Sequence, residues 1–202
     1  MLNEVNGNKL YFAKLKEDAK IPSRLDENMG YDIYACFEED YMVIEPHKTI
    51  MIPTGICSAC SEDYAIVLKE RGSTGTKGIA QRCGVIDSGY RNEWFVPITN
   101  TNATPIIIVK KEFLSQIHDY KYMSGERFNN KYGDLSVNIQ RKVRNFKEEV
   151  NIGKYITYPY EKAICQAIIL PVPKMDVQEI TAKELQEIPS QRGMGNIGSS
   201  GK

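Results

Sequence analysis

The chain has 202 residues, of which 42% are hydrophobic and 26% charged, so it is long enough to bury a core and is expected to form one domain. Its 26 Lys and Arg residues balance 26 Asp and Glu residues, and no net charge favours nucleic acid or a membrane as partner. No apolar run reaches membrane-spanning length, and residues 1–12 lack the features of a signal peptide. The five cysteines do not make a disulfide framework, which favours a reducing cytoplasm.

Short β-rich runs follow one another along most of the chain. They are rich in Ile, Val and Tyr, and Gly, Pro, Asn or Asp separate them, which is typical of an all-β sandwich or barrel-like fold. The runs are KLYFAK (9–14), YDIYAC (31–36), YMVIEP (41–46), KTIMIP (48–53), YAIVLK (64–69), WFVPIT (94–99), PIIIV (105–109) and AICQAIIL (163–170).

Cys57 and Cys60 form a CxxC pair, which raises the question of a zinc site. A zinc site needs a second pair of ligands, and the remaining Cys and His residues are scattered without matching spacing. We therefore interpret the cysteines as small buried hydrophobic residues.

The stretch GVIDSGYRNEW (84–94) starts as a buried strand and continues into a turn that carries Asp87. Aspartate favours turns because it hydrogen bonds its own backbone, and this alone would explain the residue. The alternative is a general base that a rigid hairpin holds in place.

Residues 111–158 differ from the rest of the chain and are predicted to be an insertion. Ile139, Val143, Phe146 and Val150 have the spacing of one helical face. Residues 101–160 hold ten Lys and Arg against six Asp and Glu, an excess of four positive charges. The insertion is either a solvated decoration or a surface for a regulatory protein partner. We expect the strands on both sides to reconnect through a short turn if it is removed.

The C-terminal part contains one clear helix signal, TAKELQEIP (181–189). Thr181 and Glu184 make a capping box, and Pro189 ends the helix. A glycine-rich tail, residues 192–202, follows and is expected to be flexible.

Two segments combine arginine with glycines and hydroxyl groups. RGSTGTKG (71–78) is not a Walker A motif, because Thr76 precedes Lys77 and Gly78 follows it. The tail RGMGNIGSSGK (192–202) contains GxGxxG, but too few residues follow for the helix of a dinucleotide-binding fold. Backbone N–H groups at glycines and the planar arginine fork both bind oxyanions, so the pair of segments predicts a polyphosphate ligand.

Five stretches in order resemble the five motifs of the trimeric dUTP pyrophosphatase (dUTPase) family, of the bacterial and phage type with an insertion between motifs three and four. They are MGYDIYA (29–35), RGSTGTKG (71–78), GVIDSGYRN (84–92), AICQAIILP (163–171) and RGMGNIGSSGK (192–202). The resemblance implies a jelly-roll-like β domain over residues 1–191, a C-terminal arm over 192–202 and a homotrimer. It also implies hydrolysis of dUTP to dUMP and pyrophosphate with Mg²⁺ on the triphosphate, at sites built from more than one subunit.

The resemblance assigns roles to individual residues. Asp87 matches the aspartate that activates the attacking water, Asp32 matches a first-motif aspartate that organises the metal through water, and Tyr90 matches the tyrosine under the deoxyribose. The other expected substrate-binding residues are Arg71, Gly72, Ser73, Gln81, Gly84, Ile86, Gln166, Arg192, Ile197, Gly198, Ser199 and Ser200.

The sequence also departs from the family pattern. Gly72 and Ser73 are transposed relative to the usual second motif, and Asn92 replaces a glycine after the hairpin. Ile197 stands where an aromatic residue commonly stacks on uracil, and Ala163 stands where a basic residue is common. Isoleucine can cover the base but cannot stack on it.

Two other functions compete with dUTP hydrolysis. The dCTP deaminases have a similar fold and hairpin, but their chemistry needs a glutamate where this chain has Pro97, and Glu93 is too near the turn to replace it. The second alternative is a protein-binding regulator that keeps the fold and acts through the insertion.

Overall fold

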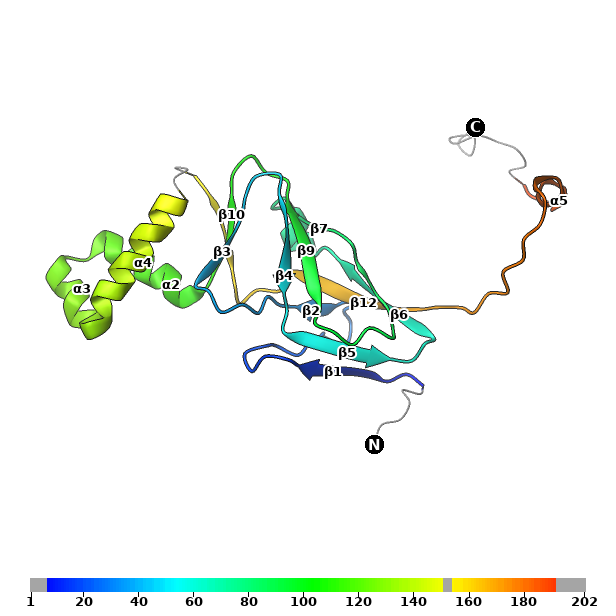
Figure 1. The fold of residues 1–202 in the computed structure, drawn as a ribbon, viewed down its shortest axis with the longest axis horizontal. Coiled ribbons are helices and arrows are strands. Elements are labelled where there is room, and N and C mark those ends of the chain that lie inside the picture. Colours follow the sequence, from blue (N-terminus) through cyan, green and yellow to red (C-terminus); the bar gives the residue numbers. More distant parts are fainter. Residues whose placement is uncertain (1–6, 151–153, 192–202) are drawn as a thin grey trace. The chain divides into compact units, whose positions relative to one another are not determined.

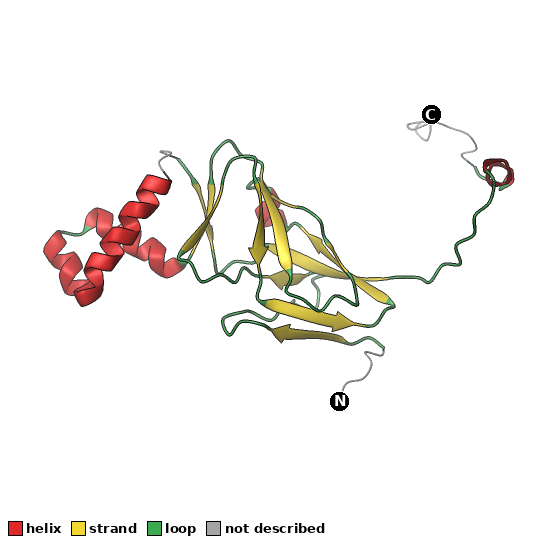
Figure 2. Ribbon diagram, viewed as in Figure 1, coloured by secondary structure: helices red, strands yellow, loops and turns green. Residues whose placement is uncertain are grey.

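The computed structural model describes residues 7–150 and 154–191. It divides the chain into two compact units, Met1–Val172 and Pro173–Lys202. The first unit contains all the strands of the described residues, together with a group of helices (Figure 2). The expected domain, residues 1–191, therefore extends beyond this unit by the segment 173–191.

The strands of the first unit are short, and most coincide with the β-rich runs of the sequence. In chain order they are β1 (Leu10–Lys14), β2 (Tyr31–Ile33), β3 (Tyr41–Ile44), β4 (Thr49–Pro53), β5 (Ile56–Cys60), β6 (Tyr64–Lys69), β7 (Ile79–Gln81), β8 (Val85–Ile86), β9 (Phe95–Asn100), β10 (Ile106–Val109), β11 (Ile156–Pro159) and β12 (Cys165–Pro171). All eight runs contain a strand, which confirms the predicted β architecture.

The strands form small sheets in which neighbours are distant in the sequence. The sheet orders are β2-β12-β6-β8, β4-β9-β7, β11-β10-β3 and β1-β5. All the strand pairs in the described residues are antiparallel except β10 with β11, which run parallel. The first of these sheets brings the first motif (β2) and the fourth motif (β12) side by side.

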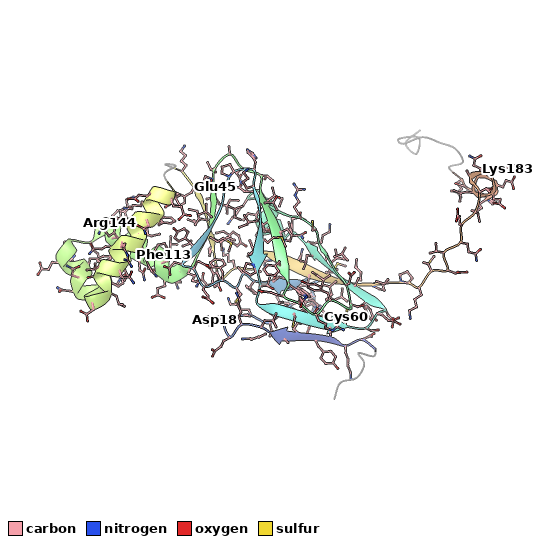
Figure 3. The ribbon with its side chains drawn as sticks, viewed as in Figure 1. Asp18, Glu45, Cys60, Phe113, Arg144 and Lys183 are labelled. Carbon is pink, nitrogen blue, oxygen red and sulfur yellow. The ribbon has the colours of Figure 1, made fainter. Side chains whose placement is uncertain are left out.

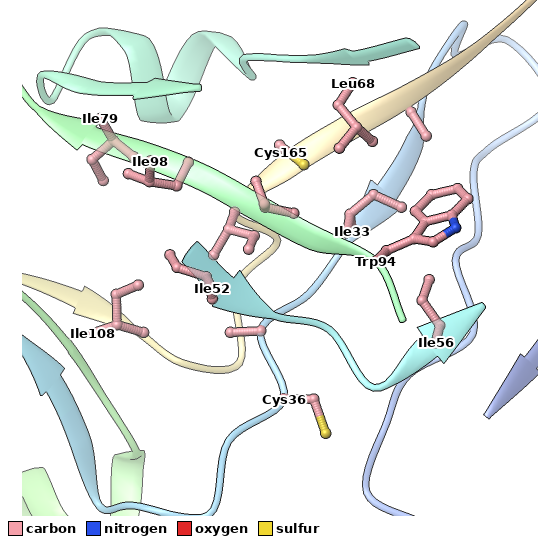
Figure 4. Close-up of a cluster of buried hydrophobic side chains, with 14 of the residues drawn as sticks. Ile33, Cys36, Ile52, Ile56, Leu68, Ile79, Trp94, Ile98, Ile108 and Cys165 are labelled. Carbon is pink, nitrogen blue, oxygen red and sulfur yellow. The ribbon is translucent and has the colours of Figure 1, made fainter. Parts of the chain in front are cut away.

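One hydrophobic core joins the sheets of the first unit. Figure 4 shows its centre, where Ile33, Ile56 and Trp94 lie together. Trp94 is fully buried, and its ring meets Phe12 of β1 edge to face at a centroid distance of 5.5 Å. Burial of large apolar side chains from every sheet is the main stabilisation of such a fold.

The predicted insertion contains a helical subdomain at one end of the β unit, next to β3 and β10 (Figure 1). It consists of α2 (Lys111–Tyr122), α3 (Gly125–Tyr132), the 3₁₀ helix η1 (Gly133–Leu135) and α4 (Ser136–Glu149). Ile139, Val143 and Phe146 of α4 are buried, as the helical spacing predicts. They form a second core with Ile107 and Val109 of β10.

Polar contacts also tie the helices to the β unit. The hydroxyl of Tyr41 on β3 donates a hydrogen bond to Glu149 at the end of α4. Lys142 of α4 pairs with Asp40 at 2.7 Å between Nζ and Oδ2. The second core holds Phe113, which Figure 3 labels on α2. The helices therefore pack on the sheet through both apolar and polar groups.

The strand β11 lies inside the range expected for the insertion but belongs to the β unit. Its Tyr158 is 1% exposed and lies in the main core. It pairs in parallel with β10, so that Ile106 faces Ile156 and Val109 faces Pro159. Parallel neighbours need a crossover of a dozen or more residues. A short turn therefore cannot join β10 to a complete β11, and reconnection after removal of residues 111–158, which include Ile156–Tyr158 of β11, stays a prediction.

Two other local expectations also need correction. Val85 was expected in a buried strand, but its side chain is 66% exposed. The cysteines were expected to be buried, and Cys36, Cys60 and Cys165 are, whereas Cys83 is exposed and Cys57 half-buried. All five are free thiols.

The second unit is described over residues 173–191. Its helix α5 (Ala182–Glu187) has the predicted capping box, in which Thr181 Oγ1 accepts from the Glu184 N–H at 3.2 Å and the Thr181 N–H donates to Glu184 Oε2 at 2.7 Å. Apolar side chains of this unit are exposed, among them Met175 at 76% and Val177 at 89%. Within the described parts of the chain, no helix is long and apolar enough to cross a membrane.

Candidate functional site

A polar pocket of about 400 Å³ collects residues from three of the five motifs. The first motif contributes Gly30 and Asp32, the second contributes Arg71 and Ser73, and the fourth contributes Gln166. Gly72 and the residues 27–29 complete the lining. The transposition of Gly72 and Ser73 does not remove either residue from the pocket.

Arg71 is held in place by several acceptors. Its Nε lies 3.0 Å from Asp32 Oδ1, and its Nη2 donates to Asp32 Oδ2 at 3.3 Å. Its Nη1 donates to the Ala163 carbonyl at 3.4 Å and to Ser73 Oγ at 3.5 Å. A guanidinium that donates hydrogen bonds on both edges keeps its plane fixed. A guanidinium with a fixed plane is suited to binding a phosphate.

The short helix α1 (Gly72–Gly75) begins directly after Arg71. The buried Thr74 fixes this turn, because its Oγ1 accepts from the Arg71 N–H at 3.1 Å and donates to the Arg71 carbonyl at 2.9 Å. A methyl group added at Gly72 would meet nothing within 4 Å, so the backbone there is open to a ligand.

Gln166 reaches the pocket from β12, between β2 and β6. It lies opposite Asp32 on one side and Lys69 on the other. Its Nε2 donates to the Glu70 carbonyl at 2.9 Å, which fixes the orientation of the amide. A methyl group at Gly30 would overlap with the side chain of Gln166, so the glycine is required by this close approach.

The hairpin of the third motif carries Asp87 and Tyr90 on an exposed turn. The Tyr90 N–H donates to the Asp87 carbonyl at 3.0 Å, and the Tyr90 hydroxyl donates to the Glu93 carbonyl at 3.0 Å. Asp87 is exposed, and Tyr90 is 38% exposed. Both side chains therefore stand on a turn whose shape the backbone fixes.

Gln81, Gly84 and Ile86 lie before this turn. Gln81 is buried, and its Nε2 donates to the carbonyls of Arg82 and Cys83, the latter at 3.3 Å. The Gly84 carbonyl accepts from the Leu68 N–H at 2.6 Å, and a side chain at Gly84 would collide with the Leu68 carbonyl. Ile86 pairs with Ile66 of β6. These residues fix the hairpin against β6.

Asp87 lies apart from the pocket within one chain. Gln166 pairs with Lys69 at one end of β6, whereas Ile86 pairs with Ile66 three residues along, and Asp87 continues away from Lys69. Three residues of a strand span about 10 Å. The pocket and the hairpin are therefore two separate parts of the surface of a single chain.

The expected residues of the tail, Arg192, Ile197, Gly198, Ser199 and Ser200, lie outside the described residues. Sequence reasoning missed Tyr158 and the Ala163 carbonyl as groups around Arg71. Tyr158 belongs to an apolar run beside the fourth motif, but nothing in the spacing indicates that its hydroxyl is buried near an arginine.

A comparison with family models matches residues 17–148 to the dUTPase family. The chain belongs to the dUTPase family. This membership confirms the predicted family, and the matched residues cover the first three motifs. The matched residues include Asp32, Arg71 and Asp87, and they end within α4.

Curated dUTPase relatives agree with this membership. The deoxyuridine 5'-triphosphate nucleotidohydrolase of Leptospira interrogans is 32% identical over 104 residues, which is 50% of this chain and 71% of the relative. The enzyme of the same name from Clostridium tetani is 24% identical over 192 residues, 93% of each chain. The second match extends across the insertion.

Solved structures of phage dUTPases share the fold. A mutant of the Staphylococcus bacteriophage 80alpha dUTPase with dUpNHpp has a TM-score of 0.64 at 21% identity and covers 97% of this chain and 100% of its own. The phage phi11 enzyme of S. aureus, described for its species-specific insert, has a TM-score of 0.56 at 18% identity and covers 86% and 96%. The expected β fold of the dUTPases, with a helical insertion, is thereby confirmed.

Proposed function

We propose that the chain hydrolyses dUTP to dUMP and pyrophosphate by attack of an Asp87-activated water at the α-phosphorus. The observation that carries the proposal is the pocket in which Asp32, Arg71 and Gln166 from three motifs of a dUTPase family member converge. Catalysis at phosphorus depends mainly on positioning and charge neutralisation, and such a pocket can supply both.

In this proposal the pocket binds the triphosphate. Arg71 presents a fixed, permanently charged fork, and Ser73 and the Gln166 amide add hydrogen bonds. The open backbone at Gly72 lets a phosphate oxygen approach closely. In the arm, Arg192, Gly198, Ser199 and Ser200 are proposed to close over the phosphates and Ile197 over the uracil.

Asp87 is proposed as the general base. An exposed carboxylate can orient one water and accept its proton. Tyr90 is proposed to pack under the deoxyribose, where its ring would exclude a ribose 2′-OH by contact. The backbone around Gly84 and Ile86, with Gln81, would recognise uracil through hydrogen bonds. Cytosine carries an amino donor where uracil has a carbonyl acceptor, so it would leave buried groups of the protein unpaired.

The separation of Asp87 from the pocket favours a site built from two chains in a homotrimer. The register of β6 keeps the two parts at least about 10 Å apart within one chain. The exposed apolar residues of the segment 173–191, such as Val177 and Leu185, are further support, because a neighbouring subunit would cover them. We propose that one subunit gives Asp87 and Tyr90 and another gives the pocket.

Mg²⁺ is the proposed cofactor, and the residues at the pocket fit it. Mg²⁺ binds oxygen ligands, keeps several waters and is commonly held by substrate phosphates with one or two carboxylates. Both carboxylate oxygens of Asp32 face Arg71, so the residue suits contact through water rather than direct ligation. When bound, the ion would offset charge on the triphosphate. The phage phi11 dUTPase structure is described as coordinating a structural Mg(II) ion.

The geometry disfavours the dCTP deaminase alternative. Pro97 is buried in β9 and has no acid–base group. Glu93, which directly follows the motif, accepts from the Gly55 N–H at 2.8 Å and so holds the hairpin to the chain before β5. A proton shuttle would have to come from a different residue.

A second proposed role belongs to the helical subdomain as a docking surface for a regulatory protein. It is packed as a body on the sheet, and a hollow of about 290 Å³ lies between α2 and α4, lined by Tyr120, Arg144, Lys147 and Glu148. The phage 80alpha dUTPases are described as controlling the transfer of virulence genes.

The proposed hydrolysis is tested by comparing Asp87→Asn with Asp134→Asn, an exposed carboxylate of η1. We expect Asp87→Asn to keep nucleotide binding and to lower kcat by about 10²–10⁴, the usual effect of removing a positioned base. The control should equal the wild type. Full turnover by Asp87→Asn would show that another group activates the water.

A further inference from the structure

Tyr158 lies behind the pocket and is not one of the residues that line it. Its side chain is 1% exposed, and its hydroxyl donates to the Ala163 carbonyl at 2.6 Å. The same carbonyl accepts from Nη1 of Arg71 at 3.4 Å. One backbone oxygen thus joins a buried phenol to the arginine that faces the pocket.

The ring of Tyr158 has little freedom to move. It is packed in the main core, and Tyr158 pairs with Ile108 in the parallel ladder of β10 and β11. Nζ of Lys77 stands 5.6 Å from the ring centroid. Burial raises the pKa of the Tyr158 hydroxyl and outweighs the opposing charge of Arg71 and a side-chain hydrogen bond with Arg71, so the phenol beside the guanidinium is neutral.

Arg71 has one firm anchor and one weaker anchor. Oδ1 of Asp32 lies 3.0 Å from Nε of Arg71, and Oδ2 of Asp32 accepts from Nη2 at 3.3 Å. Among the described residues, the Nη1 edge is held by the Ala163 carbonyl and Ser73 Oγ, at the longer distances of 3.4 and 3.5 Å. The Ala163 carbonyl therefore helps to set how the second edge of the guanidinium is turned, and the Tyr158 hydroxyl, which also interacts directly with Arg71, fixes that carbonyl.

We propose that Tyr158 is a positioning residue for dUTP hydrolysis, whose hydroxyl orients the Ala163 carbonyl and through it the guanidinium of Arg71. The inference rests on the proposed function, because it needs Arg71 to contact the triphosphate. Tyr158 does not touch the substrate. Its effect on the reaction passes through Arg71 alone.

The test is Tyr158→Phe, which keeps the ring, its packing and the Lys77 contact but removes the hydroxyl. We expect kcat/KM for dUTP to fall about five- to tenfold, the scale of one lost hydrogen bond. The melting temperature should change by only a few degrees. The matched control is Tyr160→Phe. Tyr160 directly follows β11, and its hydroxyl lies near Cys36 rather than near Arg71. The kcat/KM of this control should equal that of the wild type.

The deciding readout is the same substitution in an Arg71→Lys background. Lysine cannot make the two-edged contact, so Tyr158→Phe should cause no further loss of kcat/KM there. An equal loss in both backgrounds would overturn the inference, as would a Tyr158→Phe variant with wild-type kinetics or one that melts far below the wild type.

The outcomes also separate this inference from the proposed function. If the wild-type protein does not hydrolyse dUTP, or Arg71→Lys keeps full activity, the proposed function of the pocket fails and the role of Tyr158 fails with it. If Arg71→Lys is impaired and Tyr158→Phe is not, only the role of Tyr158 is refuted.

Discussion

Asp32 and Arg71 form an ion pair that joins the first motif to the second, with 3.0 Å between Oδ1 and Nε. The side chain of Asp32 is 33% exposed and that of Arg71 is 29% exposed, so the pair adds little to the free energy of unfolding. Its structural effect is to orient the guanidinium. The carboxylate that the family resemblance assigns to the metal is thus also the main anchor of the arginine proposed to bind phosphate.

Asp32→Asn should therefore impair substrate binding more than folding. Asparagine keeps the size of the side chain but loses the charge that holds both Nε and Nη2, so we expect KM for dUTP to rise about tenfold, the scale of a lost charge-assisted contact. The Mg²⁺ concentration for half-maximal rate should rise too. Steady-state kinetics against Asp26→Asn, an exposed carboxylate nearby, checks this, and an unchanged KM would contradict it.

Two impaired variants should restore each other if the site combines Asp87 of one chain with Arg71 of another. Asp87→Asn and Arg71→Lys each damage one half of every site in their own oligomers. Unfolding a mixture of the two proteins and refolding it together should assemble sites with both halves intact. We expect the mixture to hydrolyse dUTP well above the sum of the separately refolded variants. No recovery from mixed oligomers of verified composition would place both residues in one chain.

The second core should contribute measurably to the stability of the helical subdomain. Val143 is fully buried in the second core, whereas Val137 on the same helix is 73% exposed. Val143→Ala should lower the free energy of unfolding by about 1.5–3 kcal/mol, the value of burying a valine side chain, and Val137→Ala should change it by less than about 0.5 kcal/mol. Denaturant unfolding curves measure both. Equal effects would mean that α4 is not packed on the sheet in solution.

Two ways of removing the insertion should give different results. Replacing residues 112–153 by a flexible linker of about fifteen residues keeps β11 and spans the parallel crossover, so dUTP hydrolysis should stay within about tenfold of the wild type. Replacing residues 111–158 by a short turn removes most of β11 and Tyr158, and the protein should aggregate or lose activity. Size-exclusion chromatography and kinetics distinguish them. An inactive but folded linker variant would assign the helices to the active site.

The sequence predicted the strands well because alternation and turn residues are local signals. It missed β5, whose residues Ile56–Cys60 are mostly small or polar, and the three-residue β7. The helical stripe from Ile139 to Phe146 was predicted, and its partner surface on β10 was not. Partner strands, such as the parallel pairing of β10 with β11, are set by tertiary packing that no local pattern reports.

The same limit applies to the candidate site. The motif residues Asp32, Arg71 and Gln166 were predicted from the sequence, and the structure brings them together. The contact between Arg71 and the Ala163 carbonyl joins residues 92 positions apart. Because every residue has a backbone carbonyl, the identity of residue 163 could not predict this contact. The distance of Asp87 from the pocket also follows only from the strand register.

The most direct measurement of the central claim is pyrophosphate release from dUTP, dCTP, dTTP and UTP by the wild-type protein with Mg²⁺. The account predicts rapid release from dUTP, with dUMP as the other product, and far slower release from the three other nucleotides. Comparable rates for all four nucleotides, or release of ammonia from dCTP at a rate similar to dUTP hydrolysis, would contradict it.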